Sequence, residues 1–328
     1  MKTFQITLGA IFLAGTLFFS SCEKDEDETP PTTTETPKTI AQIATENGNF
    51  TILLDALTRT GLAATMDDPA QTLTVFAPTD AAFLSLLTEL NLTSLDDVET
   101  ALGTEGLKNV LLYHVLGAVV TSDLVTTGYV STLGINATAD PLSVYTNISS
   151  GVMLNDRATV TTADVTASNG VIHIIDKVIL PLTIYNLVNL NSDYATLTAA
   201  LGIADGSLDV LLNDPTSGPF TVFAPNEMAF GSLLTELGLA DVPALVSALG
   251  TDGLSEVLTY HVVSGNVNSN EVPTGSVATV NGENISFDLT NGVVITDANG
   301  RMSTVIAVDI QGTNGVVHGI NKVLLPKQ

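Results

Sequence analysis

The sequence contains a single cysteine, Cys22, so no disulfide can form within the chain. Its folded parts must therefore be stabilised by their packed cores. The chain is also poor in basic residues, since 10 Lys and Arg stand against 35 Asp and Glu, for a formal net charge of −25. Because phosphate binding needs clustered Lys and Arg, this charge excludes a general role in binding nucleic acid. It also argues against direct adsorption of the folded part to anionic lipid.

Tryptophan is absent, but other apolar residues are plentiful. Hydrophobic residues make up 45% of the 328 residues, which is ample for packed cores. This length is enough for two domains on the usual expectation for globular chains. An acidic surface favours solubility and says little about the fold.

The first residues of the chain have the features of a secretory signal. Lys2 precedes an apolar run over residues 4–19, and two small residues, Ser20 and Ser21, stand before Cys22. The apolar run is too short for a comfortable membrane span, which needs about 20 residues. We therefore expect residues 1–21 to be a signal peptide that is removed from the mature protein.

Cys22 stands where cleavage is expected, and this segment resembles the lipobox of bacterial lipoproteins, in which the cysteine becomes the lipidated first residue. Phe19 departs from that pattern, because leucine is commonest there. The alternative is an ordinary signal peptide with an incidental cysteine. The resemblance implies a secreted protein held at the outer membrane or cell surface of a Gram-negative bacterium, and touching the membrane through its lipid anchor only.

Residues 22–38 are expected to be a disordered linker. An acidic run over 23–28 is followed by a Thr- and Pro-rich stretch over 29–37, and neither has apolar side chains to bury. Charge repulsion and prolines keep such a tether extended. The acidic run also resembles signals that send lipoproteins to the outer face in some Gram-negative bacteria; the alternative is a solvated spacer.

The rest of the chain repeats itself. The block Thr-Val-Phe-Ala-Pro at 74–78 returns at 221–225, which is 147 residues later (221 − 74). Three further blocks recur in the same order: 101–107 as 248–254, 110–115 as 257–262, and 169–173 as 314–318. Solenoid repeats are only about 20–50 residues long. The pattern therefore predicts two tandem domains, over 39–182 and 183–328.

Each copy has helical patterns first and β patterns later, which predicts an α+β fold. In the first copy one helical stripe runs from Ile40 to Leu57, and the β-type run 73–77 is closed by Pro78. Helices are expected through 83–87, capped by Thr79 or Asp80, and through 110–114. Strands are expected at 142–145, 159–162 and 171–175. Asn169-Gly170 predicts a hairpin turn with both residues at its centre.

The Val-Phe-Ala-Pro, Tyr-His and Asn-Gly-x-x-His blocks together resemble the fasciclin-like (beta-Ig-H3) domain family, over about 39–181 and 183–326. The resemblance implies a wedge of two β-sheets with packed helices in each domain. It also implies a role in cell adhesion or matrix contact and no enzymatic activity. Short integrin-contact motifs known in animal members are not clearly present, so no receptor is implied.

All four histidines lie in the repeated blocks, which raises the question of a metal or catalytic site. A zinc site needs three or four converging ligands, and neither a His-x-x-x-His spacing nor a cysteine cluster supplies them. In the family that the chain resembles, the histidine of the Tyr-His pair is a buried packing residue. We therefore expect structural histidines, no metal, no cofactor and no catalytic residues, with His→Ala in a Tyr-His pair costing roughly 1–3 kcal/mol. The histidines and their paired tyrosines are Tyr113, His114, His173, Tyr260, His261 and His318.

An acidic residue and a proline mark the strand-to-helix junction of each copy. Asp80 and Glu227 are expected to cap a helix or to complement the dipole of its first turn; a ligand contact is the alternative. Pro78 and Pro225 are expected to fix the junction through their locked φ.

The duplicated domain and the expected anchor favour a surface protein for adhesion or matrix interaction. Its partner would be an extracellular or cell-surface protein or polysaccharide. The alternative is a module that binds a small ligand or a glycan. A hydrolase is the third reading, because carboxylates are abundant, although no Gly-x-Ser-x-Gly elbow is present.

Overall fold

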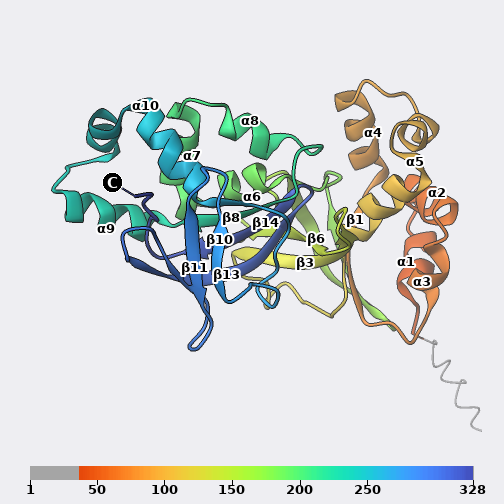
Figure 1. Cartoon of the computed structure of the whole chain (residues 1–328). Coiled ribbons are helices and arrows are strands. Elements are labelled where there is room, and N and C mark those ends of the chain that lie inside the picture. Colours follow the sequence, from red (N-terminus) through yellow and green to blue (C-terminus); the bar gives the residue numbers. More distant parts are fainter. Residues whose placement is uncertain (1–36, 328) are drawn as a thin grey trace, which may run out of the picture. The chain divides into compact units, whose positions relative to one another are not determined.

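The computed structural model describes residues 37–327, and Pro37–Gln328 form one compact unit (Figure 1). The expected signal peptide and the expected lipid site at Cys22 lie outside the described residues. Across residues 37–327, no single helix is both long and apolar enough for a membrane span; one pair bent by 86°, Glu227–Leu237 with Val242–Tyr260, reaches that length and composition.

The helices of each copy precede most of its strands. The first copy contains α1 (Ile40–Glu46), α2 (Thr51–Arg59), α3 (Ala63–Asp67), α4 (Asp80–Glu89) and α5 (Leu95–Leu112). The second contains α6 (Ile184–Leu190), the 3-10 turn η1 (Ser192–Tyr194), α7 (Ala195–Ile203), α8 (Leu208–Asn213), α9 (Glu227–Leu237) and α10 (Val242–Tyr260). In Figure 1 helices α7, α8 and α10 of the second copy lie above its strands.

The single helical stripe expected from Ile40 to Leu57 is wrong, because the chain turns between two helices. Asn47 ends α1 in an extended conformation (φ −89°, ψ 105°), and α2 begins only after Phe50. Both helices turn apolar residues toward the same core, so their combined spacing imitates one long face.

A seven-stranded sheet organises each copy. In the first copy the order is β2-β1-β7-β6-β5-β4-β3, and in the second it is β10-β11-β12-β13-β14-β8-β9. β6 pairs with β5 at one end and with β7 along the rest. The sheet therefore has two arms that share this strand, one with β3, β4 and β5 and the other with β7, β1 and β2. The α+β class is thereby confirmed. The strands are β1 (Leu73–Pro78), β2 (Val115–Leu116), β3 (Gly128–Ile135), β4 (Pro141–Asn147), β5 (Met153–Leu154), β6 (Ala158–Ala167), β7 (Gly170–Ile175), β8 (Phe220–Pro225), β9 (Val262–Ser264), β10 (Gly275–Ala278), β11 (Asn284–Asp288), β12 (Val294–Thr296), β13 (Met302–Gly312) and β14 (Gly315–Ile320).

The hairpin between β6 and β7 forms, but the Asn-Gly pair is not at its centre. Ala167 pairs with Gly170, so Ser168 and Asn169 make the turn. Only Gly170 of the expected pair has a positive φ, at 151°. A Cβ at this position would lie 1.9 Å from the carbonyl oxygen of Leu73. Glycine is therefore required by the close approach of β1 rather than by the turn itself.

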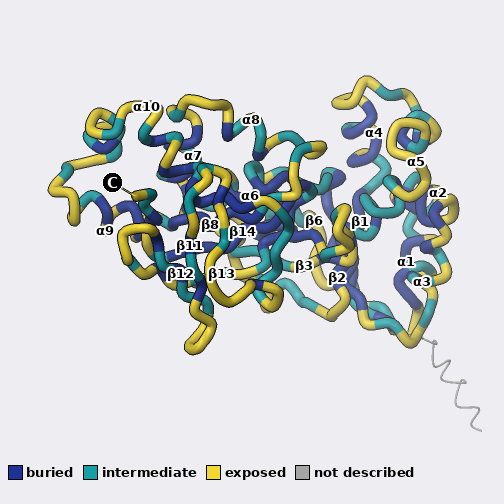
Figure 2. Tube along the Cα trace, viewed as in Figure 1, coloured by how far each residue is buried: buried dark blue, intermediate teal, exposed yellow. Residues whose placement is uncertain are grey.

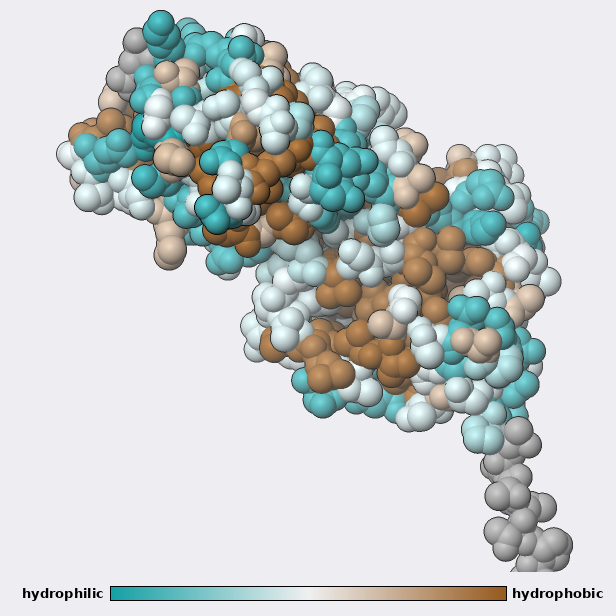
Figure 3. All heavy atoms as spheres, turned by 60° about the horizontal axis from the view of Figure 1, so that its bottom comes forward, coloured by the Kyte–Doolittle hydropathy of each residue, from teal (hydrophilic) through white to brown (hydrophobic). Residues whose placement is uncertain are grey.

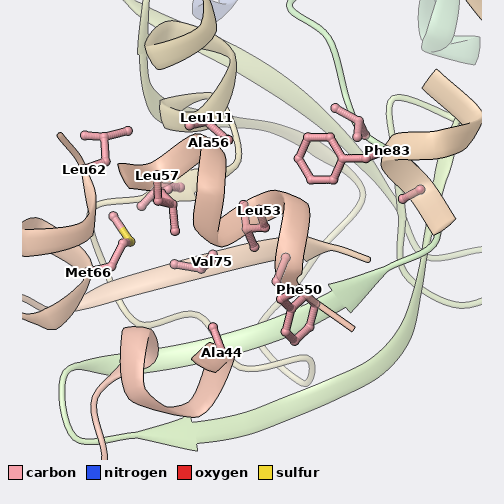
Figure 4. Close-up of a cluster of buried hydrophobic side chains, with 14 of the residues drawn as sticks. Ala44, Phe50, Leu53, Ala56, Leu57, Leu62, Met66, Val75, Phe83 and Leu111 are labelled. Carbon is pink, nitrogen blue, oxygen red and sulfur yellow. The ribbon is translucent and has the colours of Figure 1, made fainter. Parts of the chain in front are cut away.

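Two hydrophobic clusters fill each copy, one on either side of β1 or its counterpart β8. In the first copy Val75 and Ala77 face a cluster built by the helices, while Phe76 faces a cluster between the arms of the sheet. Figure 4 shows the helical cluster, in which Leu53 of α2 and Val75 of β1 lie close together. The alternation follows from the two-residue period of a strand. Figure 2 shows this buried interior as dark blue under an exposed outer layer.

Polar contacts join the two copies within this unit. The hydroxyl of Tyr129 on β3 donates to the carbonyl of Leu187 on α6 at 2.8 Å. The backbone N–H of Gln311 on β13 donates to the hydroxyl of Ser143 on β4 at 3.0 Å. Asp140 accepts from the side-chain amide of Asn268 at 2.7 Å. Apart from Tyr129 and Leu182, which pack against a cluster of the second copy, each copy builds its clusters from its own residues.

Candidate functional site

The Tyr-His pair lies at the end of α5, where the helix meets both clusters. Tyr113 is fully buried and donates its hydroxyl hydrogen to the carbonyl of Ser143 at 2.8 Å. It also accepts from the side-chain amide of Asn155 at 3.0 Å. Nδ1 of His114 contacts the carbonyl of Val110 at 2.7 Å, and its Nε2 accepts from the backbone N–H of Ile179 at 3.0 Å. These bonds define a neutral imidazole that carries its proton on Nδ1.

The second copy repeats this arrangement. Tyr260 donates to the carbonyl of Asn284 at 2.7 Å. Nδ1 of His261 contacts the carbonyl of Val257 at 2.7 Å, and its Nε2 accepts from the N–H of Leu324 at 2.9 Å. In both copies the imidazole therefore ties the end of a helix to the closing Leu-Pro segment.

Burial makes these two histidines responsive to acid. It lowers the pKa of His114 and of His261 from 6.5 to about 4. Between these values the unfolded chain binds a proton at each site and the folded chain does not, so the free energy of unfolding falls as the pH falls. We expect each histidine to remove about 3 kcal/mol of stability as the pH drops from 7 to 4.

Urea unfolding at several pH values checks this expectation. The window from pH 7 to 5 lies above the usual titration ranges of aspartate and glutamate, so the histidines dominate it. A full-length chain carrying both His114→Gln and His261→Gln should show a much smaller slope in this window. A wild-type stability that stays flat from pH 7 to 5 would contradict the expectation.

The other two histidines lie on β7 and β14 beside an aspartate and a serine. Nε2 of His173 contacts the carbonyl of Val120 at 2.9 Å, and its Nδ1 accepts from the N–H of Asp164 at 3.3 Å. Asp164 has a positive φ of 60° and accepts both the N–H and the hydroxyl of Ser122. His318, Asp309 and Ser269 repeat this set, and burial lowers the pKa of His318.

These residue types are those of a nucleophilic triad, but their order is different. A triad places the histidine between the serine and the carboxylate, so that the imidazole takes the hydroxyl proton. Here the hydroxyl of Ser122 bonds to the carboxylate of Asp164, and both nitrogens of His173 are engaged by backbone groups. The set therefore fixes a loop to the sheet and supplies no base for the serine.

Metal binding has no support among residues 37–327, where no group of three or more His, Cys, Asp or Glu residues is placed to hold an ion. The four histidines are 1–3% exposed, and each ring nitrogen is hydrogen-bonded within the protein. No lone pair of these rings is left for a ligand.

Asn169 and Asn314 form the connecting points that pattern analysis missed. Oδ1 of Asn169 accepts from the N–H of Ile40 at 2.9 Å, while its Nδ2 donates to the carbonyls of Met66 and Asp68 at 2.9 and 3.0 Å. Asn314 makes the same three bonds in the second copy. The sequence does contain a sign of this role, because an asparagine stands before Gly-x-x-His in both copies. That recurrence was attributed to a hairpin turn instead.

The acidic residues after the Ala-Pro blocks cap a neighbouring helix. Asp80 accepts the N–H groups of Ile52 and Thr51 at 2.7 and 3.2 Å, at the start of α2. Glu227 likewise accepts the N–H of Thr196 at 2.6 Å, in α7. Neither α2 nor α7 has a side-chain cap from its own N-cap residue. The carboxylates therefore satisfy helix donors that would otherwise be unpaired.

The other junction residues act on their own helix or strand. Thr79 and Asn226 are the N-caps of α4 and α9, and their side chains accept from Ala82 and Ala229 respectively. Pro78 and Pro225 are the last residues of β1 and β8, where they pair with Ile175 and Ile320.

The outer face of β13 carries exposed apolar side chains that its counterpart in the first copy lacks. Met302, Ile306 and Val308 are 56%, 52% and 50% exposed. We call these three residues the β13 row. The counterparts, 145 residues earlier in the chain (306 − 161), are Arg157, Thr161 and Ala163 on or beside β6. Figure 3 shows that hydrophobic residues gather at several places on one face of the molecule.

The protein thus consists of two tandem α+β domains, and in each of them the repeated histidines and asparagines connect distant segments of the fold. The Fasciclin domain family model matches residues 48–181 and 192–326. The chain belongs to the Fasciclin domain family.

Two relatives and one solved structure show how far the likeness extends. Protein sll1483 of Synechocystis is 37% identical over 145 residues, which cover 44% of this chain and 74% of that protein. The transforming growth factor-beta-induced protein ig-h3 of Sus scrofa is 28% identical over 257 residues, which cover 77% of this chain and 34% of that protein. The FAS1 domain pair of the insect cell adhesion molecule Fasciclin I superposes with a TM-score of 0.51 at 19% identity, covering 85% of this chain and 98% of that one. The last likeness shows the fold alone.

Proposed function

We propose that this protein is a lipid-anchored adhesion protein of the bacterial cell surface, which binds an extracellular protein or polysaccharide through its second domain. The β13 row carries the proposal, because it is an exposed apolar strip on a chain with a net charge of −25. Exposed apolar groups rimmed by polar ones mark interaction surfaces. The adhesion role of the insect molecule with the same fold supports this reading.

The first domain offers a matched surface for comparison. Its counterparts Thr161 and Ala163 are also exposed, but they present little apolar area. A pair of aspartates placed on either strand adds the same charge to the same kind of surface. Any difference between the two variants therefore reports the β13 row and not the general acidity of the chain.

Attachment of the cells that produce the protein to matrix-coated surfaces tests the proposal. We expect Ile306→Asp with Val308→Asp to lower attachment at least roughly tenfold, as loss of central contact residues does. Thr161→Asp with Ala163→Asp should leave it unchanged. A Cys22→Ala chain should be released from the cells and should support no attachment.

Labelling with a membrane-impermeant reagent measures display of each variant. Equal attachment by both double-aspartate variants, with normal display, would refute binding through the β13 row. Retention of the Cys22→Ala chain on the cells would refute the lipid anchor separately.

A further inference from the structure

Each domain contains an apolar cavity at the same place, between two helices and the closing Leu-Pro segment. In the first domain it lies between α4, α5 and residues 178–181 and has a volume of about 310 Å³. In the second it lies between α9, α10 and residues 323–325 and has a volume of about 210 Å³. Protein interiors are otherwise packed with few voids larger than a water molecule. Because the two cavities lie at matching positions, they are a property of the domain fold and not a local packing defect.

The cavity of the first domain offers water nothing to bind. His114 is the only lining residue with a polar side chain, and both of its nitrogens are already bonded to Val110 and Ile179. An enclosed apolar cavity of about 150 Å³ holds no water but binds benzene, so an apolar lining of this kind favours apolar ligands over water. The lining selects for hydrocarbon, because a polar group placed inside would lose its hydrogen bonds.

The cavity reaches the surface between α4 and α5. Leu90 and Leu102 both line it, and they are 45% and 47% exposed. Gly103, with φ 74° and ψ 164°, breaks α5 directly after Leu102. The two arms of the helix therefore lie along different walls of the cavity, with Leu95 and Leu102 from one arm and Leu107 from the other. Gly250 breaks α10 in the same way, with φ 72° and ψ 171°. This kink explains the repeated Ala-Leu-Gly-Thr block.

We propose that each domain binds a medium-length alkyl chain in this cavity, with the polar end of the molecule remaining at the mouth. A fatty acid, a fatty alcohol or the acyl chain of a lipid supplies that chemistry. By proportion to benzene in about 150 Å³, the first cavity holds roughly a dozen carbons and the second roughly eight. This function is independent of attachment through the β13 row, because none of the cavity residues belongs to that row.

Binding of the neutral dye N-phenyl-1-naphthylamine to the full-length protein tests the proposal. The chain has no tryptophan, so the fluorescence of the dye is read against a low protein background. We expect two sites per chain and displacement of the dye by 1-dodecanol below its solubility limit. Val110→Phe fills the first cavity and Val257→Phe the second, so each should remove one site, and the double variant should bind at least tenfold more weakly.

Controls separate the cavities from general surface hydrophobicity. Leu124→Phe enlarges a side chain that is 63% exposed and lies outside both cavities, so it should leave two sites. Thermal melts report whether each variant folds. If Val110→Phe does not fold, Leu102→Asp places a charge at the exposed mouth and should weaken the first site at least tenfold. Two undiminished sites in the Val110→Phe, Val257→Phe chain, or no displacement of the dye by 1-dodecanol, would overturn the proposal.

A second and more specific test compares alcohols whose alkyl chains differ in length. The Val257→Phe protein keeps only the larger cavity and should prefer 1-dodecanol to 1-octanol. The Val110→Phe protein keeps only the smaller one and should show a reduced or reversed preference. Identical preferences in the two variants would contradict binding inside cavities of different size. A melting temperature raised by 1-dodecanol in wild type but not in the double variant would support it, since a ligand that binds only the folded state stabilises it.

Discussion

Replacing Asn169 by alanine is expected to lower the free energy of unfolding by about 3–5 kcal/mol. The side chain is 1% exposed and satisfies one N–H and two carbonyls, on Ile40, Met66 and Asp68. Each buried group left without a partner costs about 1–3 kcal/mol, and the cavity left behind adds to this. The bonds join the start of α1, the end of α3 and the β6–β7 turn, so their loss loosens three segments at once.

Urea and thermal unfolding of the full-length protein measure this effect. The melting temperature should fall by roughly 10 °C for a domain of this size. Asn169→Asp should not rescue stability, because a carboxylate cannot donate to the two carbonyls that Nδ2 serves. Asn47→Ala, which removes only an exposed bond to the N–H of Asn49, should cost well under 1 kcal/mol. If the Asn169→Ala and Asn47→Ala proteins have the same melting temperature, the three hydrogen bonds of Asn169 contribute little to stability.

The sequence was informative where the structure depends on local pattern or on repetition. The blocks around Phe76 and Phe223 predict a duplicated α+β domain, because the motifs recur in the same order at nearly the same offset, 147 residues for three blocks (221 − 74) and 145 for the last (314 − 169). Strand β1 and helix α4 follow from a β-branched run, a proline and a capping threonine, all within a few residues. These are the features that neighbours in the chain decide.

Contacts between distant residues could not be read in the same way. Asp80 is the first residue of α4, so the pattern assigns it to the first turn of that helix, yet its carboxylate accepts from the N–H of Ile52 in α2, 28 residues earlier. Asn169 stands before a glycine, so it resembles a turn residue, yet it bonds 129 residues away at Ile40. The cavities are a further case, because leucines that line a void have the same spacing as leucines that fill a core.

The unequal cavities also show what a repeat pattern conceals. Leu87 and Leu95 line the cavity of the first domain, whereas their counterparts Leu234 and Val242 do not line that of the second. The two sequences keep the same apolar character at these positions. Whether an apolar side chain at these positions fills a core or lines a void depends on how the helices pack, which the residue types do not specify.

Replacing His114 by alanine should lower the free energy of unfolding by about 3–5 kcal/mol at pH 7. This is more than the roughly 1–3 kcal/mol expected from the sequence alone. The structure adds a second buried partner: the carbonyl of Val110 and the N–H of Ile179 would both be left unpaired. The lost ring also enlarges the neighbouring apolar cavity, which it lines. His261→Ala should act in the same way on the second domain, through Val257 and Leu324.

The pH dependence of this cost distinguishes a structural histidine from a merely buried one. Protonation of the unfolded chain below pH 6.5 weakens the wild-type protein, because burial holds the pKa of His114 at about 4. The alanine variant has no such group, so the gap in unfolding free energy between wild type and His114→Ala should narrow by about 3 kcal/mol from pH 7 to pH 4. Urea unfolding of both proteins across this range measures the gap, with the exposed-site variant Leu124→Ala as the control whose gap stays constant. A gap that does not change with pH would mean that His114 is protonated alike in the folded and unfolded chains, and that its two hydrogen bonds do not hold the neutral ring.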